Sequence, residues 1–426
     1  MDDASCRTIS RTDPPITRIA LCRFCRAELR DVVVDLGMSP LSESYITAAQ
    51  SNAMEPFYPL HVYVCTDCWL VQLEEYVRAE HIFTEYAYFS SYSTSWCQHA
   101  AAYTEAITDR LSLTTLSQVV EIGSNDGYLL QYFVSRGVPV LGIEPAANVA
   151  AVAQSKGINT LIRFFGVEAA RDVVAGGIRA DLLIGNNVLA QIPDINDCVA
   201  GLKTLLAPRG VITIEVPHLV RLIEGNQFDT IYHEHFYYFS LVALAGIFAE
   251  HGLMIFDVEE LTTHGGSLRV YACHTGAPVR IQRSVTALRD RELRVGVTTS
   301  QYYSKFTEQV YETKRALLDF LIRAKRTGRS VAGYGAPGKG NTLLNYCGIR
   351  TDFLDYTVDR NPYKHGKLLP GTHVPIFPPE HLKETRPDFV LILPWNLRDE
   401  IVAQLSYIRA WGGQFVVPIP RLEVFS

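Results

Sequence analysis

The middle of the chain alternates short apolar runs with segments whose apolar residues recur every three or four positions. Four apolar runs have the pattern of strands: Gln118–Ile122, Val138–Ile143, Asp181–Gly185 and Gly210–Val216. This regular alternation of strands and helices predicts a parallel sheet that is covered on both faces. Arg269–Cys273 is interpreted as a further strand.

The C-terminal part repeats this alternation on a smaller scale. It follows a long helical pattern at about Tyr302–Thr327, and Ser330–Gly335 then has the pattern of a strand that opens into a glycine-rich turn. Three later apolar runs also have the pattern of strands: Phe353–Val358, Phe389–Leu393 and Gln414–Val417. The pattern therefore predicts a second, smaller sheet at about residues 328–420.

The first part of the chain is organised differently. Residues 18–80 carry paired cysteines between short β-like runs at 32–34 and 62–64. Beyond this segment, apolar positions three or four apart from Ala100 to Leu111 predict a helix. The fold class is therefore predicted to be α/β, preceded by a small segment of a different kind.

Composition is that of an ordinary globular protein. The chain has 426 residues, of which 48% are hydrophobic and 20% charged, and this predicts two or three folded domains. The net charge is −6 without a basic block, which argues against a dedicated nucleic-acid binder. No apolar stretch is long enough to span a bilayer, and the N-terminus lacks the apolar core of a signal peptide. We therefore expect a cytoplasmic protein that contacts no membrane.

Two CxxC pairs, Cys22–Cys25 and Cys65–Cys68, stand out among the nine cysteines. In a cytoplasmic chain, such cysteines are expected to be thiols or metal ligands and not disulfides. The four thiolates of Cys22, Cys25, Cys65 and Cys68 can surround Zn²⁺ at about 2.3 Å, and a closed four-sulfur site has a structural role. The alternatives are a redox pair or four unrelated cysteines, but two pairs within one short segment favour zinc.

A glycine turn follows the first central strand. Glu121 ends this strand, and the turn that leads into the next helix contains Gly123, Asn125, Asp126 and Gly127. Glycines at this place let the backbone come close to a ligand at the carboxyl end of the strand. The turn departs from the dinucleotide pattern GxGxxG, because asparagine occupies the second glycine position. It fits the E/DxGxxxG pattern of S-adenosylmethionine-dependent methyltransferases, and a generic βαβ turn is the alternative.

Later strands bring more polar groups to the same edge of the predicted sheet. Glu144 ends the second strand, where a carboxylate suits the two hydroxyl groups of a ribose. Asn186 and Asn187 follow the strand Asp181–Gly185. Together with the glycine turn, these three residues are predicted to bind S-adenosylmethionine.

A cluster of histidine, glutamate and tyrosine follows the strand Gly210–Val216, where an α/β enzyme carries substrate-contacting residues. The histidines, the glutamate and the tyrosines of Tyr232–Ser240 offer a general base, an orienting carboxylate and a hydrogen-bond donor for an enolate. A metal site at His233 and His235 is one alternative, because the two side chains would share a face on a strand. A purely structural polar cluster is the other alternative.

Two further glycine-rich turns lie nearer the C-terminus. His264 and Arg269 flank a Gly-Gly pair, which suits either a polar ligand or a plain turn that enters a strand. Gly333–Gly338 is a formal GxGxxG, and Asp359 ends a strand about 20 residues later, as in an NAD site. A P-loop is excluded because its Mg²⁺-binding Ser/Thr is missing. The turn therefore predicts either NAD or the phosphate of another nucleotide, contacted by Lys339.

In combination, these motifs resemble the zinc-containing, S-adenosylmethionine-dependent C-methyltransferases that act on nucleotide-linked ketodeoxysugars such as TDP-4-keto sugars. The resemblance covers nearly the whole chain and is carried by the CxxC pairs and four segments: Glu121–Gly127, Tyr232–Ser240, His264–Arg269 and Tyr334–Tyr346. It implies a zinc-binding domain at 18–80 and a central Rossmann-like methyltransferase domain at 81–300. It also implies a C-terminal Rossmann-like domain at 301–426 that contacts the sugar nucleotide and does not bind NAD.

The resemblance also implies roles for single residues. His235 is the expected base, with Tyr232, Glu234 and Tyr86 around the sugar. The expected substrate-binding residues are Gln191, His264, Arg269, Lys339 and Asn341. In this hypothesis His235 removes the proton on C-3 next to a ketone at C-4, and Tyr232 or Tyr86 hydrogen-bonds the enolate oxygen. The resulting carbanion then takes the methyl group.

Gln191 departs from the family, which is expected to carry histidine there. Glutamine cannot move a proton at neutral pH, so it either positions an oxygen atom or reflects a different substrate stereochemistry. Two other functions stay open: an NAD-dependent oxidoreductase that uses Gly333–Gly338 and Asp359, and a non-catalytic zinc scaffold. The sequence does not determine the sugar, the nucleotide or the methylated carbon. It also leaves the oligomeric state open, with a monomer among the compatible states.

Overall fold

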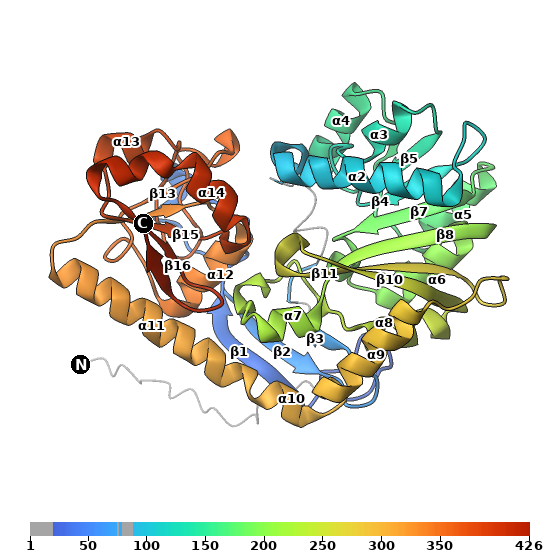
Figure 1. Cartoon of the computed structure of the whole chain (residues 1–426), viewed down its shortest axis with the longest axis horizontal. Helices are drawn as coiled ribbons and strands as arrows, with labels where there is room; N and C mark the ends of the chain where they lie inside the picture. Colours follow the sequence, from blue (N-terminus) through green and yellow to red (C-terminus); the bar gives the residue numbers. More distant parts are fainter. Residues whose placement is uncertain (1–19, 75, 79–87) are drawn as a thin grey trace, which may run out of the picture.

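The computed structural model describes residues 20–74, 76–78 and 88–426, which form three sheets with their surrounding helices. In Figure 1 the central lobe lies on the right and the C-terminal lobe on the left, with the N-terminal strands below and between them. Tyr86, one of the expected catalytic residues, lies outside the described residues.

The central lobe is built on a seven-stranded sheet in the order β10-β11-β8-β7-β4-β5-β6. Its strands are β4 (Val119–Ile122), β5 (Val140–Ile143), β6 (Thr160–Leu161), β7 (Ala180–Asn186), β8 (Leu206–Pro217), β10 (Leu253–Leu261) and β11 (Ser267–His274). Its helices are α2 (Thr94–Leu111), α3 (Leu130–Val134), α4 (Ala147–Ser155), α5 (Val167–Ala175), α6 (Ile195–Leu205), α7 (Leu219–Glu224), α8 (Leu241–Glu250) and α9 (Arg283–Val295). The strands from β6 to β8 pair in parallel, which confirms the alternation read from the sequence.

The central sheet also has an antiparallel edge, which the sequence pattern did not predict. β11 pairs antiparallel with β8, and β10 pairs antiparallel with β11. Only residues 262–266 connect β10 to β11, and so short a connection can join antiparallel strands but not parallel ones. The sequence analysis looked for uninterrupted apolar runs and missed β10, because Asp257, Glu259 and Glu260 interrupt the apolar residues of this strand.

The N-terminal sheet is antiparallel and borrows a strand from the central part of the chain. Its order is β1-β2-β3-β9. The strands are β1 (Asp31–Ser39), β2 (Tyr58–Val64), β3 (Val71–Leu73) and β9 (Tyr237–Tyr238). Because β9 begins two residues after His235, the segment that carries the cysteines is paired directly with the chain next to the expected base.

The C-terminal lobe contains a six-stranded sheet in the order β14-β13-β12-β15-β16-β17. Its strands are β12 (Val331–Tyr334), β13 (Thr357–Val358), β14 (Ile376–Phe377), β15 (Phe389–Ile392), β16 (Gln414–Val417) and β17 (Glu423–Phe425). Its helices are α10 (Ser300–Ser304), α11 (Phe306–Arg326), α12 (Gly338–Cys347), α13 (His381–Thr385) and α14 (Arg398–Gln404). Of the predicted strand Phe353–Val358, only Thr357 and Val358 form a strand, β13.

One hydrophobic core joins the N-terminal sheet to the C-terminal lobe. Val34 and Leu60 of the sheet belong to the same buried cluster as Leu317 of α11 and Leu343 of α12. Figure 1 shows α11 running along the C-terminal lobe and on beneath β1. The domain limits at 80 and 300 stay predictions, and the N-terminal sheet fixes the C-terminal lobe beside the central one.

Candidate functional site

The four paired cysteines converge on one point of the N-terminal sheet. Cys22 Sγ lies 3.6 Å from Cys68 Sγ, Cys25 Sγ lies 3.5 Å from Cys65 Sγ, and all four sulfur atoms lie within 4.8 Å of one another. A tetrahedron of four sulfurs at about 2.3 Å from zinc has edges of about 3.8 Å. The four side chains therefore fit a closed, structural zinc site.

Gln72 supports this metal centre and was missed from the sequence. It is fully buried in β3, its side-chain amide donates to Cys22 Sγ at 3.1 Å, and its Oε1 accepts from the backbone N–H of Arg23 at 2.8 Å. Such hydrogen bonds to ligand sulfurs orient the ligands. The Arg23 guanidinium also donates to the carbonyl of Pro193 at 3.0 Å, and this bond holds the Cys22–Cys25 segment against the central lobe.

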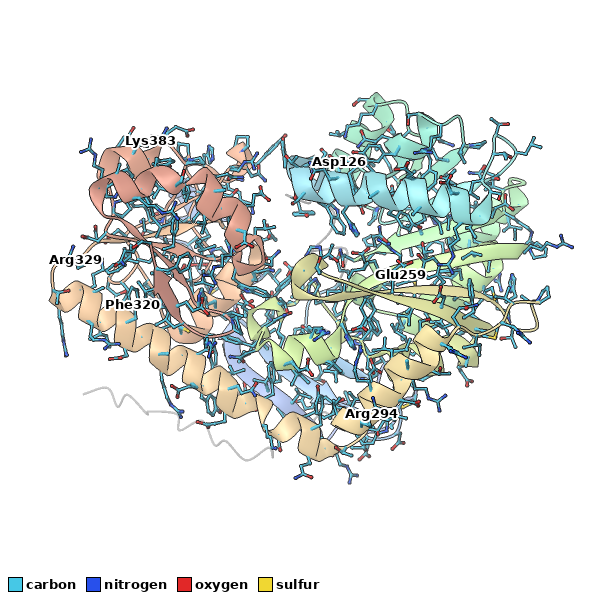
Figure 2. All side chains as sticks on the ribbon, viewed as in Figure 1. Asp126, Glu259, Arg294, Phe320, Arg329 and Lys383 are labelled. Carbon is cyan, nitrogen blue, oxygen red and sulfur yellow. The ribbon has the colours of Figure 1, made fainter. Side chains whose placement is uncertain are left out.

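The glycine turn after β4 has a backbone that few side chains would allow. Gly123, Asn125 and Gly127 all have positive φ, at 61°, 49° and 76°. A Cβ atom on Gly123 would lie 2.6 Å from a methyl carbon of Val188, so glycine is required there for space as well as for conformation. Figure 2 shows Asp126 at the end of the central lobe that faces the C-terminal lobe.

Glu144 holds this turn from the next strand. Its carboxylate accepts from the backbone N–H groups of Asn125 and Ala146, both at 2.9 Å. Burial raises the pKa of this carboxyl group. The sequence predicted a ribose ligand for Glu144, and the structure adds a second role, which is to fix the loop that would surround the cofactor.

Several buried oxygen atoms near the turn lack a hydrogen-bond donor among the described residues. They are both carboxylate oxygens of Glu121, Asp126 Oδ1, Asn186 Oδ1 and Asn187 Oδ1. Burial, followed by the charges of Glu144 and Asp126, raises the pKa of Glu121 well above its usual range. Unpaired buried acceptors are costly, so the site suits a ligand that brings donors and positive charge. The ammonium, sulfonium and ribose hydroxyl groups of S-adenosylmethionine meet this description.

The chain that follows Tyr86 lies on the glycine turn. The backbone N–H of Ser90 donates to Asn125 Oδ1 at 2.8 Å, and Ser91 hydrogen-bonds the carboxylate of Asp126. Phe89 stacks on Tyr363 of the C-terminal lobe, with their ring centroids 5.5 Å apart. Residues 88–93 therefore connect the predicted cofactor turn to the C-terminal lobe.

His235 is held as a neutral imidazole with a defined tautomer. Its Nδ1 lies 3.0 Å from the carbonyl oxygen of Thr230, which can only accept, so Nδ1 carries the hydrogen and Nε2 carries the lone pair. Burial, followed by the charge of Lys339, lowers the pKa of His235 to about 4. The ring of Tyr232 packs against it, with the ring centroids 4.1 Å apart.

The neighbours of His235 in sequence point elsewhere. Glu234 is buried and accepts from the hydroxyl of Ser42 at 2.8 Å, and burial and the charge of Glu43 raise its pKa to about 7. His233 Nε2 bonds the carbonyl of Pro59 at 3.1 Å. Within the described ranges, the cysteine cluster is the only group of three or more side chains that could hold a metal. Glu234 therefore faces the N-terminal domain, and the metal alternative for the two histidines has no third ligand there.

Lys339 and His264 come close to His235 from other parts of the chain. Lys339 lies at the start of α12, and its charge lowers the pKa of both histidines. Burial is the larger cause for His264, whose pKa falls to about 4. His264 has a φ of 52°, and no described residue hydrogen-bonds its buried Nε2 atom. A strained residue with an unpaired polar atom is typical of a functional site.

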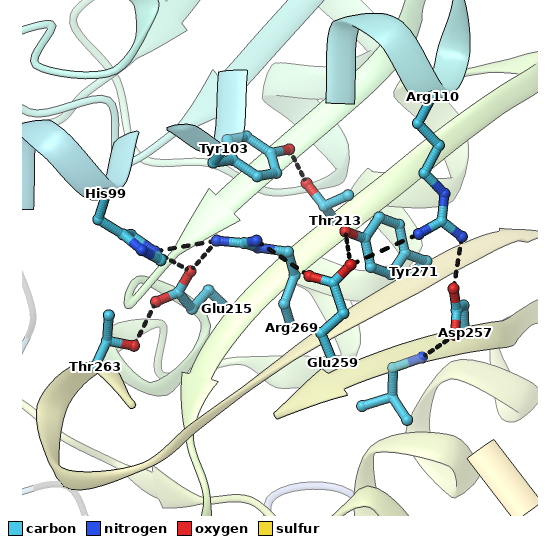
Figure 3. A network of polar contacts seen from close by, with 11 residues as sticks. His99, Tyr103, Arg110, Thr213, Glu215, Asp257, Glu259, Thr263, Arg269 and Tyr271 are labelled. Carbon is cyan, nitrogen blue, oxygen red and sulfur yellow. Dashed lines mark hydrogen bonds and ion pairs between the residues drawn. The ribbon is translucent and has the colours of Figure 1, made fainter. Parts of the chain in front are cut away.

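Arg269 belongs to an internal ion-pair network, shown in Figure 3. Its guanidinium lies 2.8 Å from Glu215 and 3.2 Å from Glu259, and His99 Nε2 lies 2.9 Å from Glu215. Burial alone would raise the pKa of Glu215, but the His99 hydrogen bond and the Arg269 charge lower it. The terminal nitrogens of Arg269 are thus paired with protein carboxylates, and its expected contact with substrate stays a prediction.

Gln191 and Asn341 lie next to residues of the site. Gln191 ends a short 3-10 helix (Leu189–Gln191), and the preceding carbonyl, of Ala190, accepts from the backbone N–H of Phe236 at 2.7 Å. Asn341 donates to the carbonyl of Ser42, and its Oδ1 is buried without a partner among the described residues. Both positions are compatible with contacts to a substrate.

The glycine turn of the C-terminal lobe is filled by the chain itself. A Cβ atom on Gly338 would lie 2.8 Å from Ser42 Oγ, and the Tyr45 hydroxyl donates to the carbonyl of Ala336 at 2.5 Å. Asp359, which an NAD site would use for the ribose, accepts from the backbone N–H of Ala336 at 2.7 Å. Lys364 donates to the carbonyl of Ala336 at 2.8 Å.

Sequence reasoning also missed Asp229, Trp395 and Asn396. The Trp395 indole N–H donates to Asp229 Oδ2 at 2.7 Å, and Lys339 donates to Asn396 Oδ1 at 2.8 Å. No local pattern distinguishes these residues, because the partners in both pairs are far apart in the chain.

Comparisons with known proteins agree with this arrangement. Family models match three segments: a zinc binding domain at residues 22–83, a methyltransferase domain at 96–258 and a C-methyltransferase C-terminal domain at 262–420. C-methyltransferase NovU of Streptomyces niveus is 36% identical over 405 residues, which cover 95% of this chain and 96% of NovU. None of the described helices combines the length and apolar character that a membrane span requires.

Two solved structures of methyltransferases are similar to part of this chain. An S-adenosylmethionine-dependent methyltransferase from Clostridium acetobutylicum is 8% identical, with 42% of this chain and 92% of that chain covered and a TM-score of 0.33. The CcbJ methyltransferase from Streptomyces caelestis is 12% identical, with 42% of this chain and 90% of that chain covered and a TM-score of 0.33.

Proposed function

The chain belongs to the C-methyltransferases that have a zinc-binding domain and use S-adenosylmethionine, and from this premise we propose that it methylates a carbon atom of a nucleotide-linked keto-deoxysugar. The proposed position is C-3, next to a ketone at C-4, and the proposed nucleotide is TDP or a similar one. The observation that carries the proposal is the buried, neutral imidazole of His235 beside Lys339 and His264.

Methylation at carbon first requires the removal of a proton from that carbon. A ketone at C-4 acidifies the proton on C-3, and His235 Nε2 has the lone pair to accept it because Nδ1 donates to Thr230. A positioned general base typically contributes about 10²–10⁴-fold to the rate. The lowered pKa keeps the imidazole in its neutral, basic form at neutral pH.

Negative charge then develops on the ketone oxygen. The Lys339 ammonium, the unpaired Nε2 of His264 and the hydroxyl of Tyr232 are the groups proposed to stabilise it, because charge and donors already aimed at the oxyanion need no reorganisation. S-adenosylmethionine, when bound, supplies the electrophilic methyl group. Glu121, together with the glycine turn held by Glu144, is proposed to orient the cofactor.

The C-terminal lobe is proposed to contact the nucleotide part of the substrate. Asn341 lies in the first turn of α12, and its buried Oδ1, which has no partner among the described residues, is the atom proposed to contact the nucleotide. Gln191 is proposed to position an oxygen atom of the sugar. Tyr86, which lies outside the described residues, keeps its proposed role around the sugar.

A panel of nucleotide-linked keto sugars tests this function. Each sugar is incubated with the enzyme and S-adenosylmethionine labelled with ¹³C at its methyl group, and the product is examined by NMR. We expect the label on the carbon next to the ketone, coupled to the sugar carbon. A label attached to oxygen or nitrogen, or no transfer to any keto sugar, would contradict the proposal.

A further inference from the structure

We propose that Trp395 is a positioning residue of the active site, which fixes the turn that holds His235 from the opposite lobe. The turn is the 3-10 helix η4 (Phe228–Thr230), and its last residue accepts the hydrogen bond from His235 Nδ1. This inference rests on the proposed role of His235 as the base.

The C-terminal lobe holds the chain on both sides of Thr230. The Trp395 indole N–H donates to Asp229 Oδ2 at 2.7 Å, and the Thr342 hydroxyl donates to the carbonyl of Ile231 at 3.0 Å. The carbonyl of Thr230, which sets the tautomer of His235, therefore lies between two anchors that come from the other lobe.

The hydrogen bond from Trp395 matters for the position of Asp229 because Asp229 is completely buried and cannot be hydrated. The second carboxylate oxygen of Asp229 has no hydrogen-bond partner among the described residues, and burial raises the pKa of the group to about 7. The charge of Lys339 and the backbone N–H groups of Asp229 and Thr230 also stabilise the carboxylate. Removing the Trp395 donor from this buried group therefore removes part of the compensation for its lost hydration. Without the indole N–H, we expect η4 to shift so that Asp229 reaches water or another donor.

The ring of Trp395 also touches the two other elements of the site. Lys339 Nζ lies 4.8 Å from the centroid of the Trp395 ring. Gly265 packs against the edge of the same ring, so closely that a Cβ atom on Gly265 would lie 2.6 Å from Trp395 Cη2. One side chain thus contacts the turn below His235, the turn that carries His264, and the ammonium of Lys339. Trp395 therefore sets the relative positions of His235, His264 and Lys339, three of the four groups assigned to proton removal and charge stabilisation.

The test compares two tryptophan variants of the same lobe. Trp395→Phe keeps an aromatic face for Lys339 but removes the N–H that Asp229 accepts. Trp411→Phe is the matched control, because the Trp411 indole N–H donates to the backbone carbonyl of Pro387 at 3.0 Å. We expect Trp395→Phe to lower kcat by about tenfold or more, with KM and S-adenosylhomocysteine affinity changed far less, and Trp411→Phe to leave kcat near wild type.

Two further measurements separate positioning from a general loss of stability. Asp229→Asn can still accept from Trp395, so we expect it to retain more activity than Asp229→Ala. In substrate-free protein, ¹⁵N NMR of labelled histidine reports the tautomer of His235, which we expect to be Nδ1–H in the wild type and mixed in Trp395→Phe. Equal tautomer populations and equal kcat in the Trp395 and Trp411 variants would overturn the inference. If the wild type transfers no methyl group to any keto sugar, the proposed function fails, and the tautomer measurement still decides this inference.

Discussion

The two glycine turns of this protein share one local design. Each follows a buried parallel strand and leads to a helix, and each is held by a carboxylate at the end of the next strand. Glu144 accepts from the backbone N–H of Asn125 at 2.9 Å in the central lobe, and Asp359 accepts from that of Ala336 at 2.7 Å in the C-terminal lobe. By sequence, the C-terminal turn is even the better match to a dinucleotide site.

Their surroundings differ. Around the central turn, buried oxygens of Glu121, Asp126 and Asn186 have no donors among the described residues. Around the C-terminal turn, Ser42 and Tyr45 from the β1–β2 connection occupy the space next to the backbone. The same strand–turn–helix unit therefore presents unpaired buried acceptors, as a ligand site would, in one lobe, and docks another domain in the other. Tertiary neighbours, and not the glycine pattern, decide between the two uses.

The largest expected effect sharpens this contrast between the lobes. His235→Asn should lower turnover by about 10²–10⁴-fold, because it removes the proposed base, and should leave S-adenosylhomocysteine affinity unchanged. His365 is the matched control, since its Nε2 lies 2.6 Å from the carbonyl of Asp359 beside the C-terminal turn. His365→Asn should change turnover by only about twofold. A similar loss of turnover in the two variants would contradict the assignment of the base to His235 in the central lobe.

Zinc removal tests whether the two turns are independent. Chelation should lower the midpoint of thermal unfolding by on the order of 10 °C, because a structural zinc site contributes directly to folding free energy. The N-terminal domain that covers the C-terminal turn should loosen, while the central turn should still bind S-adenosylhomocysteine. Calorimetry with and without chelator measures both quantities. Loss of cofactor binding in step with the metal would show that the turns are coupled.

Substitution of Glu144 and of Asp359, the carboxylates that hold the two turns, should affect cofactor binding differently. Glu144→Gln should weaken S-adenosylhomocysteine binding by about tenfold or more, because it removes a charged acceptor from the turn and from the ribose. Asp359→Asn should leave this affinity unchanged, although both variants should lose thermal stability by similar amounts. Isothermal titration and thermal unfolding of the two variants provide the comparison. An equal loss of affinity would contradict the assignment of the cofactor to the central turn.

The smallest effect concerns pH. The pKa of His235 is lowered from 6.5 to about 4, so between these values the unfolded chain binds a proton that the folded chain does not. The contribution of His235 to stability should therefore fall as the pH decreases from 6.5 to 4, and no change from this group is expected above pH 6.5. An NMR titration of labelled histidine should show His235 still neutral at pH 5.5. A midpoint near 6.5 would show that the ring is not buried as described.

The sequence predicted those parts of the molecule that depend on local pattern. Apolar runs identified the parallel strands, and the CxxC pairs identified four cysteines that converge as a metal site requires. The cofactor edge at the turn after Glu121 stays a prediction. The sequence did not predict contacts between residues that are far apart in the chain. Nothing near Glu234 indicates that Ser42 will bind it, and nothing near Asp229 indicates Trp395.

The Arg269 network shows the same limit. An arginine beside a Gly-Gly turn suits an anionic ligand equally well, and only the antiparallel pairing of β11 with β8 and β10 brings it against Glu215 and Glu259. Strand register across the sheet is set by three-dimensional packing, which a single chain segment does not encode. The antiparallel edge of the central sheet was likewise not predicted.

Titration of the wild-type protein with S-adenosylhomocysteine and, separately, with NADH tests the central claim most directly. The account predicts saturable binding of S-adenosylhomocysteine at a single site per chain, with no measurable heat of binding for NADH. Saturable binding of NADH, or no binding of S-adenosylhomocysteine, would contradict it, because the turn at Gly123–Gly127 would then not be the cofactor site.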